Sequence, residues 1–195
     1  MHLDQPRITP TTEADWDDDS RPIVEAIERN GGRPLNIFRT MARHPKLFKR
    51  WMVFGNHVLS NSTLPARERE LVILRTGYLC TSGYEWAQHV AIGRRSGLTD
   101  DEITRIAAGP QDPAWSAGDA TLLTATDELM ATKFISDATW ARLSVAWSEQ
   151  QLMDIVFTVG QYTLVSMALN TFGVQIEPET DKFPPQLFVG GRFRA

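Results

Sequence analysis

The chain has 195 residues, of which 42% are hydrophobic and 23% are charged, and its formal net charge is -4 at pH 7. This length and composition are typical of one globular domain, and the lack of a basic surplus argues against nucleic acid as a main partner. The N-terminus is polar and acidic, unlike a secretory signal. We see no uninterrupted apolar run that would span a bilayer and therefore expect a cytoplasmic protein with no membrane partner.

Cys80 is the one cysteine of the sequence. An intramolecular disulfide and any dithiol mechanism within one chain are therefore excluded. We expect Cys80 to be a small buried hydrophobic residue rather than a nucleophile.

In chain order, residues 1–20 are expected to form an extended arm, because Pro6 and Pro10 disfavour a helix and an acidic run follows. Residues 21–175 read as a single helical domain, and residues 176–195 as a tail that packs on the domain or on a neighbouring subunit. Strand-type alternation is scarce, so the predicted fold class is all-α. The expected helices, some with capping signals, lie at about 21–30, 36–43, 45–61, 64–80, 84–96, 100–108, 116–133, 137–147 and 149–172.

Some boundaries carry specific expectations. Thr63 is the expected N-cap of the fourth helix, Gly97 the residue that ends the fifth, and Thr99 with Glu102 a capping box. The last long helix is expected to break near Gly160. The segment from Thr63 to Gly97 then reads as two helices joined by a short turn.

This hairpin carries the candidate chemistry. Ser82, Glu85 and His89 are spaced by three and then four residues, which stacks them along one side of a helix. A buried carboxylate and imidazole one turn apart can share a proton and serve general acid–base catalysis. Glu70, on the preceding helix, can orient His89 or act as a second acid. The plainer alternative is an ordinary Glu–His pair on a helix surface.

Three further residues are candidates for substrate binding. Arg75 lies within an apolar run, where its guanidinium can pair with a substrate carboxylate, or with an acidic side chain of the protein. Tyr162 and Asn170, on the last long helix, can close a pocket, or they can be core residues with satisfied hydrogen bonds. Glu85 and His89 offer two ligands for a metal, but no third lies at a telling spacing, so no metal site is expected.

Two stretches resemble a known family. LPARERELVILRTGYLC followed by YEWAQHVAIGRRSGL is similar to the core of the carboxymuconolactone decarboxylase family, which includes the alkylhydroperoxidase D-like proteins. The stretch from DELMATKF to LNTFGV is similar to the second half of the longer members. The resemblance covers about residues 45–175. It implies an alkylhydroperoxidase D-like helical fold that assembles as a homotrimer or hexamer with pockets near subunit contacts.

The peroxidase branch of that family has a glutamate, two cysteines separated by two residues, and a histidine. These positions fall on Glu70, Ser82, Glu85 and His89, so both thiols are missing. A serine hydroxyl cannot cycle through a disulfide, which disfavours thiol peroxidase activity. The resemblance instead implies a lyase that uses no cofactor.

The sequence therefore predicts a carboxy-lyase whose catalytic residues are His89, Glu85 and Glu70. Its substrate would be a small carboxylated lactone or unsaturated acid, bound with help from Ser82, Arg75, Tyr162 and Asn170, in aromatic compound catabolism. Another acid–base enzyme on the same scaffold (isomerase, dehydratase or hydrolase) and a non-catalytic oligomer that binds a small molecule are the alternatives.

Overall fold

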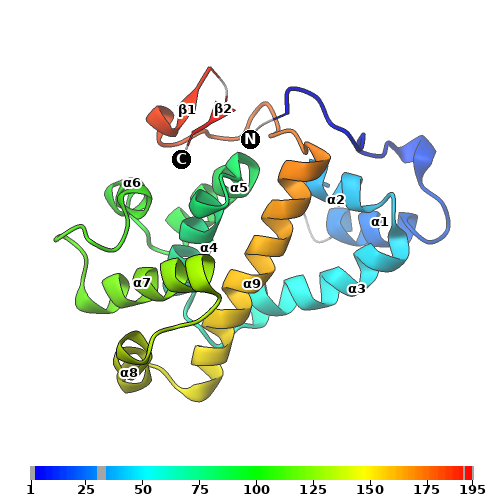
Figure 1. Cartoon of the computed structure of the whole chain (residues 1–195). Coiled ribbons are helices and arrows are strands. Elements are labelled where there is room, and N and C mark those ends of the chain that lie inside the picture. The colour runs from blue at the N-terminus through cyan, green and yellow to red at the C-terminus, as the bar shows by residue number, and fades with distance from the viewer. Residues whose placement is uncertain (1–2, 30–33, 191, 195) are drawn as a thin grey trace.

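The computed structural model describes residues 3–29, 34–190 and 192–194, and within these ranges the protein is built from helices (Figure 1). The all-α fold class is confirmed. The helices are α1 (Arg21–Arg29), α2 (Asn36–Met41), α3 (Pro45–Asn56), α4 (Ala66–Leu79), α5 (Gly83–Arg95), α6 (Asp100–Ala108), α7 (Ala117–Thr132), α8 (Asp137–Ala146) and α9 (Glu149–Phe172). Strands β1 (Phe188–Val189) and β2 (Arg192–Phe193) and helical turns at Glu13–Asp15, His57–Asn61 and Pro185–Leu187 complete the described elements.

Helix α4 lies at the centre of the fold. Four consecutive residues, Leu71 to Leu74, are fully buried, as expected of a helix that is covered on every side rather than one that faces solvent. Helices α5, α6, α7 and α9 pack around it. The polar residues of α4 and α5 therefore sit in rigid, close-packed surroundings.

Helix α9 crosses the molecule as one unbroken helix, so the expected break at Gly160 is wrong. No proline interrupts its hydrogen-bond ladder, and a lone glycine only lowers helix stability modestly. Among the described residues, α9 is the one helix long and apolar enough to cross a membrane, with a mean hydropathy of 1.4, which differs from our sequence expectation. Half of that stretch is buried inside the protein, as in the core helix of a globular fold.

Most helix boundaries follow their capping signals. Thr99 and Glu102 form the predicted capping box, and Gly97 follows the end of α5 with a φ of 102°. The expected cap at Thr63 is wrong, because α4 begins only at Ala66. The backbone N–H and hydroxyl of Thr63 instead donate to a carboxylate oxygen of Asp154 at 2.6 and 2.7 Å, which ties this loop to α9.

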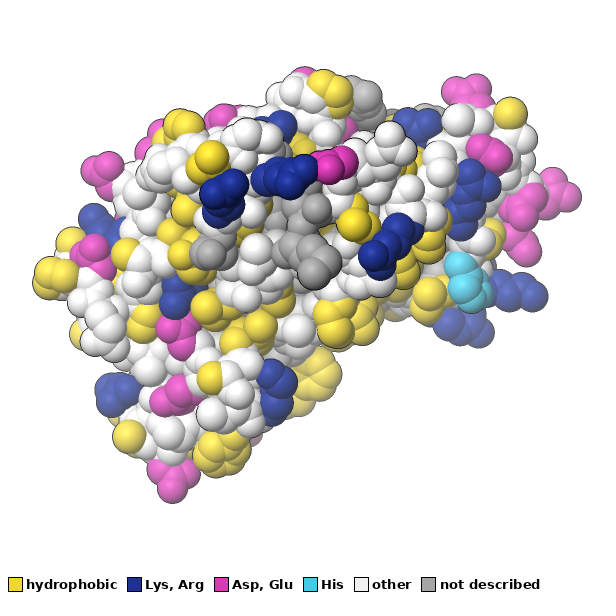
Figure 2. Space-filling model, turned by 45° about the horizontal axis from the view of Figure 1, so that its top comes forward, with side chains coloured by type: hydrophobic (Ala, Val, Ile, Leu, Met, Phe, Trp, Pro, Cys, Tyr) yellow, Lys and Arg dark blue, Asp and Glu magenta, His cyan; other side chains and the backbone are white. Residues whose placement is uncertain are grey.

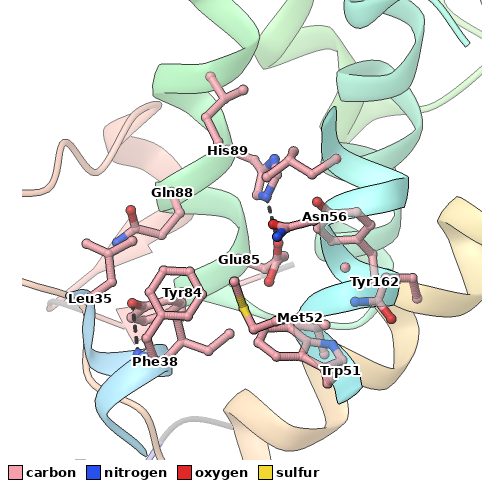
Figure 3. Close-up of a pocket in the computed structure, with 16 residues that line it drawn as sticks. Leu35, Phe38, Trp51, Met52, Asn56, Tyr84, Glu85, Gln88, His89 and Tyr162 are labelled. Carbon is pink, nitrogen blue, oxygen red and sulfur yellow. Dashed lines mark hydrogen bonds and ion pairs between the residues drawn. The ribbon is translucent and has the colours of Figure 1, made fainter. Parts of the chain in front are cut away.

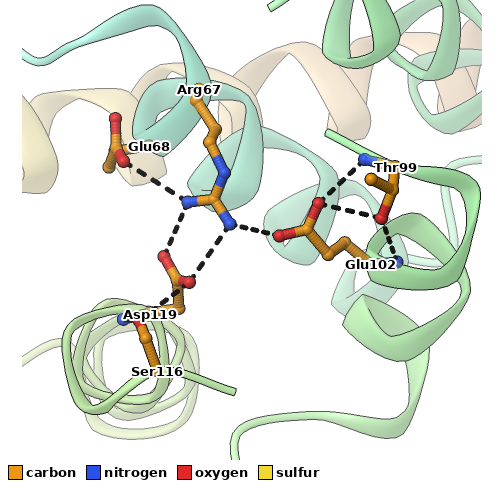
Figure 4. Close-up of polar contacts among 6 residues, drawn as sticks. All are labelled: Arg67, Glu68, Thr99, Glu102, Ser116 and Asp119. Atoms are coloured by element: carbon orange, nitrogen blue, oxygen red, sulfur yellow. Dashed lines mark hydrogen bonds and ion pairs between the residues drawn. The ribbon is translucent and has the colours of Figure 1, made fainter. Parts of the chain in front are cut away.

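A charged cluster around Arg67 joins three helices (Figure 4). The guanidinium donates to both carboxylate oxygens of Asp119 on α7, at 2.8 and 3.1 Å. It also pairs with Glu102 on α6 and with Glu68 on its own helix. Since Glu102 and Asp119 also contact the caps of α6 and α7, this cluster fixes how both helices begin against α4.

The C-terminal segment packs back onto α5. The indole N–H of Trp86 donates to the carbonyl of Phe183 at 2.7 Å, and the Phe193 ring lies 5.8 Å from the Trp86 ring. A Cβ on Gly83 would lie 2.6 Å from the Cβ of Phe193, so only glycine allows the strand to approach this closely.

Candidate functional site

The α4–α5 hairpin brings three ionisable side chains into direct contact. The Nδ1 of His89 lies 2.7 Å from Oε2 of Glu70, and its Nε2 lies 3.0 Å from Oε1 of Glu85. Glu85 and His89 are one turn apart on α5, and Glu70 reaches them from α4. Each of the three is at most 6% exposed, so this is a buried cluster rather than the surface pair of the plainer alternative.

The two carboxylates determine the protonation of His89. Burial lowers the imidazole pKa, but the charge and hydrogen bonds of Glu70 and Glu85 outweigh it and raise the pKa to about 10. At neutral pH the ring is therefore an imidazolium that donates from both nitrogens, one proton to each carboxylate. Arg69 adds a second positive charge 3.5 Å from the other oxygen of Glu70.

The cluster borders a cavity of about 150 Å³ between α2, α3, α5 and α9 (Figure 3). Glu85 and His89 form one part of its wall, whereas Glu70 lies behind them and does not line it. Most of the wall is apolar, with amide groups from Asn56, Gln88 and Gln161 among the polar exceptions. No arginine or lysine lines this cavity in the described part of the chain, so His89 is its one cationic group.

Tyr162 lines the same cavity and covers His89. The two rings lie 4.9 Å apart with an interplanar angle of 85°, an edge-to-face contact. Burial and the nearby charges of Glu85 and Glu70 raise the pKa of the Tyr162 hydroxyl well above its usual value, so it stays neutral. It can donate a hydrogen bond but cannot serve as an anionic base.

The C-terminal segment holds the opposite side of the cavity in place. Glu177 is 3% exposed and accepts hydrogen bonds from the Tyr84 hydroxyl at 2.9 Å and the Gln88 amide at 2.6 Å. It also accepts from the backbone N–H of Asn36, at the start of α2, at 2.7 Å. Since Tyr84, Gln88 and α2 all contribute to the cavity wall, Glu177 links its parts.

Arg75 is not placed for the role we predicted. Its guanidinium donates to both oxygens of Asp127, at 2.7 and 2.8 Å, and to the carbonyl of Ile106 at 2.8 Å. Arg75 thus hydrogen-bonds to the last turn of α6, and it lies over the Tyr78 ring instead of lining the cavity. The alternative in which it pairs with an acidic side chain of the protein describes its contacts.

Ser82 and Asn170 also lie outside the cavity wall. Ser82 is fully buried at the N-cap of α5, and its hydroxyl has no hydrogen-bond partner among the described residues. The amide of Asn170 donates to the carbonyl of Cys80 at 2.9 Å, which ties α9 to the end of α4. Cys80 is half-buried, and burial raises the pKa of its thiol, so it is not an activated thiolate.

Several residues that line the cavity were not among the site residues predicted from the sequence. On α5, Tyr84, Gln88 and Ile92 recur every four residues beside Glu85 and His89. On α3, the wall residues Trp51, Met52, Gly55, Asn56 and the later Leu59 follow the same helical spacing. Periodicity marked these positions as one side of a helix, but only the packing of α3 against α5 and α9 shows that they enclose a cavity.

Among the described residues, no group of three or more His, Cys, Asp or Glu side chains is arranged so that it could hold a metal ion.

Comparisons with known proteins agree with this picture. Residues 45–128 match the model of the carboxymuconolactone decarboxylase family. No curated protein matches the chain. One similar structure is an alkylhydroperoxidase AhpD core protein from Ralstonia eutropha JMP134, an uncharacterized peroxidase-related protein. It has a TM-score of 0.77 at 20% identity, over 89% of this chain and 93% of that one.

Two more solved structures are similar in fold. A peroxidase-related protein from Silicibacter sp. TM1040 has a TM-score of 0.76 at 16% identity, over 91% of this chain and 92% of that one. The debrominase Bmp8 in complex with 2,3,4-tribromopyrrole has a TM-score of 0.73 at 14% identity, over 88% of this chain and 91% of that one. The resemblance seen in the sequence is thus confirmed: residues 45–128, which carry Glu70, Glu85 and His89, match the carboxymuconolactone decarboxylase family, and the chain has the alkylhydroperoxidase D-like all-α fold.

Proposed function

We propose that this protein is a cofactor-independent acid–base enzyme, and that its reaction is a decarboxylation of a small unsaturated acid or carboxylated lactone. The observation that carries the proposal is the position of His89, which is held between Glu70 and Glu85 at the wall of an apolar cavity. Where the peroxidase branch has two thiols, this chain has Ser82 and Glu85, which leaves proton transfer as the chemistry available at this place.

The proposed mechanism uses the three residues as a proton relay. Breaking the bond between the substrate carbon and its carboxylate releases carbon dioxide and leaves an electron pair that is delocalised into the conjugated carbonyl. Glu85, which lines the cavity, takes the proton from Nε2 of His89 and passes it to that carbon, which leaves Glu85 ionised again and His89 neutral. Glu70 stabilises the imidazolium before the transfer and orients the ring throughout. A proton from solvent then restores the imidazolium of His89.

The cavity wall determines how a substrate would be held. Since Arg75 is engaged elsewhere, a carboxylated substrate would be positioned by shape and by the amides of Gln88, Asn56 and Gln161. An apolar wall beside Glu85 favours the delocalised anion over the localised carboxylate, which assists loss of carbon dioxide.

Other acid–base reactions remain the second candidate. Isomerisation, dehydration and hydrolysis need the same positioned acid and base, and a helical oligomer that binds a small molecule without turnover is the non-catalytic alternative. The tribromopyrrole complex of Bmp8 supports the idea that a fold of this type accommodates a small planar ring. Because the fold likeness rests on 14% identity, we do not propose debromination for this chain.

The test is a screen of small carboxylated lactones and unsaturated acids with the purified protein. We expect carbon dioxide release, a change in ultraviolet absorbance, and incorporation of one deuterium at the former carboxyl carbon in heavy water. Glu85→Gln and His89→Gln should abolish these signals, whereas Glu149→Gln, an exposed carboxylate at the start of α9, should not. An absorbance change without carbon dioxide would favour an isomerase, and full activity in His89→Gln would overturn the assigned role.

A further inference from the structure

A second cavity lies directly beside the first. It has a volume of about 460 Å³ and is lined by residues of α2, α3, α9 and the start of the C-terminal tail. Ile37, Trp51 and Val165 line both cavities, so the two share a wall. Arg50 is its one charged lining residue in the described chain and is exposed. The second cavity is therefore apolar inside and charged only where it meets solvent.

Two buried polar atoms around this cavity have no partner in the protein. Thr40 is 3% exposed and lines the second cavity, and its hydroxyl forms no hydrogen bond with any described residue. The indole N–H of Trp51, in the wall between the cavities, is likewise buried and unpartnered. Buried polar groups are almost always hydrogen-bonded in folded proteins, and an oxygen of a bound ligand would supply the acceptor that these two atoms lack.

The volumes point the same way. Small-molecule sites occupy roughly 300–1,000 Å³, and the cavity at Glu85 and His89, at about 150 Å³, falls below this range. It has room for a small ring but not for a longer ligand. The second cavity, at about 460 Å³, lies within the range and adjoins the first.

We propose that the two cavities form one site for an elongated ligand. Its polar, unsaturated carbonyl end lies beside Glu85, and its apolar tail fills the second cavity, with an oxygen along the tail that accepts a hydrogen bond from Thr40 or Trp51. The chemistry of the carbonyl end rests on the proposed function, whereas binding of the tail does not. The ligand class is a molecule with an uncharged apolar chain or ring system as its tail and the unsaturated carbonyl, with the carboxyl group that is lost, at its other end.

Isothermal titration of the full chain with three unreactive saturated ketones tests the tail. We choose butanone, heptan-2-one and undecan-2-one, which share one head and differ in tail length. Affinity should rise about three- to four-fold for each added methylene, as expected for burial of apolar surface, until the cavity is full. Glu85→Gln should keep this length dependence, because the tail does not contact that carboxylate.

Two variants fill the second cavity from opposite walls. Ala168→Phe acts from α9 and Met41→Phe from α2, and neither residue lines the first cavity. Each should abolish the dependence on tail length while butanone binds as before. A thermal melt checks folding, and the use of two walls means that one poorly folded variant leaves the other informative.

The unpartnered hydroxyl has its own test. Among methyl ketones of equal length with one ether oxygen at different tail positions, one isomer should bind several-fold more tightly than the rest. Thr40→Val or Trp51→Phe should remove that advantage, and Thr40→Val should leave undecan-2-one unaffected.

The outcomes separate this inference from the proposed function. Equal affinity for all three ketones would overturn the inference, even if turnover of a small substrate is found. Length-dependent binding without any turnover would support it while the proposed function fails. If Ala168→Phe or Met41→Phe changed the mass of the protein in solution without altering ketone binding, a second copy of the chain would occupy this cavity and the inference would be wrong.

Discussion

The Nε2 of His89 lies 3.0 Å from Oε1 of Glu85, one turn earlier on α5, and both side chains line the same cavity. Since the other ring nitrogen is held by Glu70, Glu85 is the group through which the imidazolium proton reaches the cavity. Spacing along the helix brings Glu85 and His89 together, and packing of α4 against α5 adds Glu70.

Replacing Glu85 with glutamine keeps the shape of the side chain and removes its charge. We expect the pKa of His89 to fall from about 10 towards 6.5, because Glu85 is one of the two carboxylates that raise it. Turnover should fall about 10²–10⁴-fold, the usual effect of losing general acid–base catalysis. NMR titration of the imidazole measures the first effect, and Glu149→Gln is the control. An unchanged His89 titration would show that the pair contributes nothing to its protonation.

The raised pKa of His89 also predicts how stability depends on pH. The folded-state value of about 10 lies above the unfolded value of 6.5, so the folded protein binds this proton more tightly. The resulting stabilisation is complete below about pH 6.5 and is lost as the pH rises towards 10. It should amount to a few kcal/mol at most.

Urea unfolding at several pH values between these limits, compared with His89→Gln, isolates this contribution. The difference in unfolding free energy between the two proteins should narrow as the pH rises, because the other titrating groups are common to both. A difference that stays constant with pH would contradict the raised pKa.

Loss of Arg67 should destabilise the fold by about 2–4 kcal/mol, because it leaves Asp119, only 9% exposed, without its cation. Arg67→Met, which retains much of the side-chain volume, should show this in urea unfolding. The matched control is Arg29→Ala, whose ion pair with Glu25 is exposed and should contribute below about 1 kcal/mol. Equal effects of the two variants would show that the Arg67 cluster does not stabilise the packing of α4, α6 and α7.

Gly83→Ala should displace the C-terminal hairpin, since the new Cβ would lie 2.6 Å from the Cβ of Phe193. Overpacking of this kind costs about 1–3 kcal/mol. Hydrogen exchange should increase in residues 183–194. Gly118→Ala, whose added Cβ would meet only Ser116 at 3.8 Å, should be neutral or slightly stabilising. Unchanged exchange in the tail of Gly83→Ala would refute the close packing.

We propose that the outer side of α9 is a surface for self-association. Its exposed residues Met153, Val156 and Phe157 follow the three- and four-residue spacing of helices that pack against each other. In Figure 2, hydrophobic side chains are spread over much of the face shown, and most acidic ones lie towards its edges. Contiguous exposed apolar side chains are typical of protein interfaces.

We therefore expect a second copy of the chain to cover α9. Light scattering should give the mass of a homo-oligomer, and Phe157→Glu should shift the protein to a monomer without loss of helical content. The exposed residue Val145 lies on α8, so Val145→Glu is the control and should leave the mass unchanged. A wild-type monomer at high concentration would refute this expectation.

Much of the fold was accessible from the sequence because its signals are local. Capping at Thr99 and the positive φ of Gly97 depend on a few neighbouring residues, and α6 begins and α5 ends where these signals place them. Thr63 carried the same kind of signal, but its hydroxyl binds Asp154, which is 91 residues away. A pairing at that distance along the chain leaves no local pattern.

The candidate site likewise has contacts that follow from local spacing and contacts that depend on distant parts of the chain. Glu85 and His89 share one helix, so their spacing predicted their contact, and the family resemblance added Glu70. The partners of Arg75 lie on α6 and α7, and the cavity needs α3, whose residues the sequence analysis left unassigned. Which arginine is free to bind a ligand depends on where acidic residues from other helices come to lie, and a single sequence does not contain that information.

Through the hydrogen bonds of Glu177, the C-terminal segment helps to hold the cavity wall together. One carboxylate joins Tyr84 and Gln88 of α5 to the first N–H of α2, so two walls of the cavity meet at a residue that follows the final helix. A chain that stopped before Glu177 would keep Glu70, Glu85 and His89 but lose the group that holds α2 against α5. Proteolysis or a C-terminal fusion near Glu177 would therefore disturb the cavity wall that binds the ligand, while the contacts among Glu70, Glu85 and His89 stay in place.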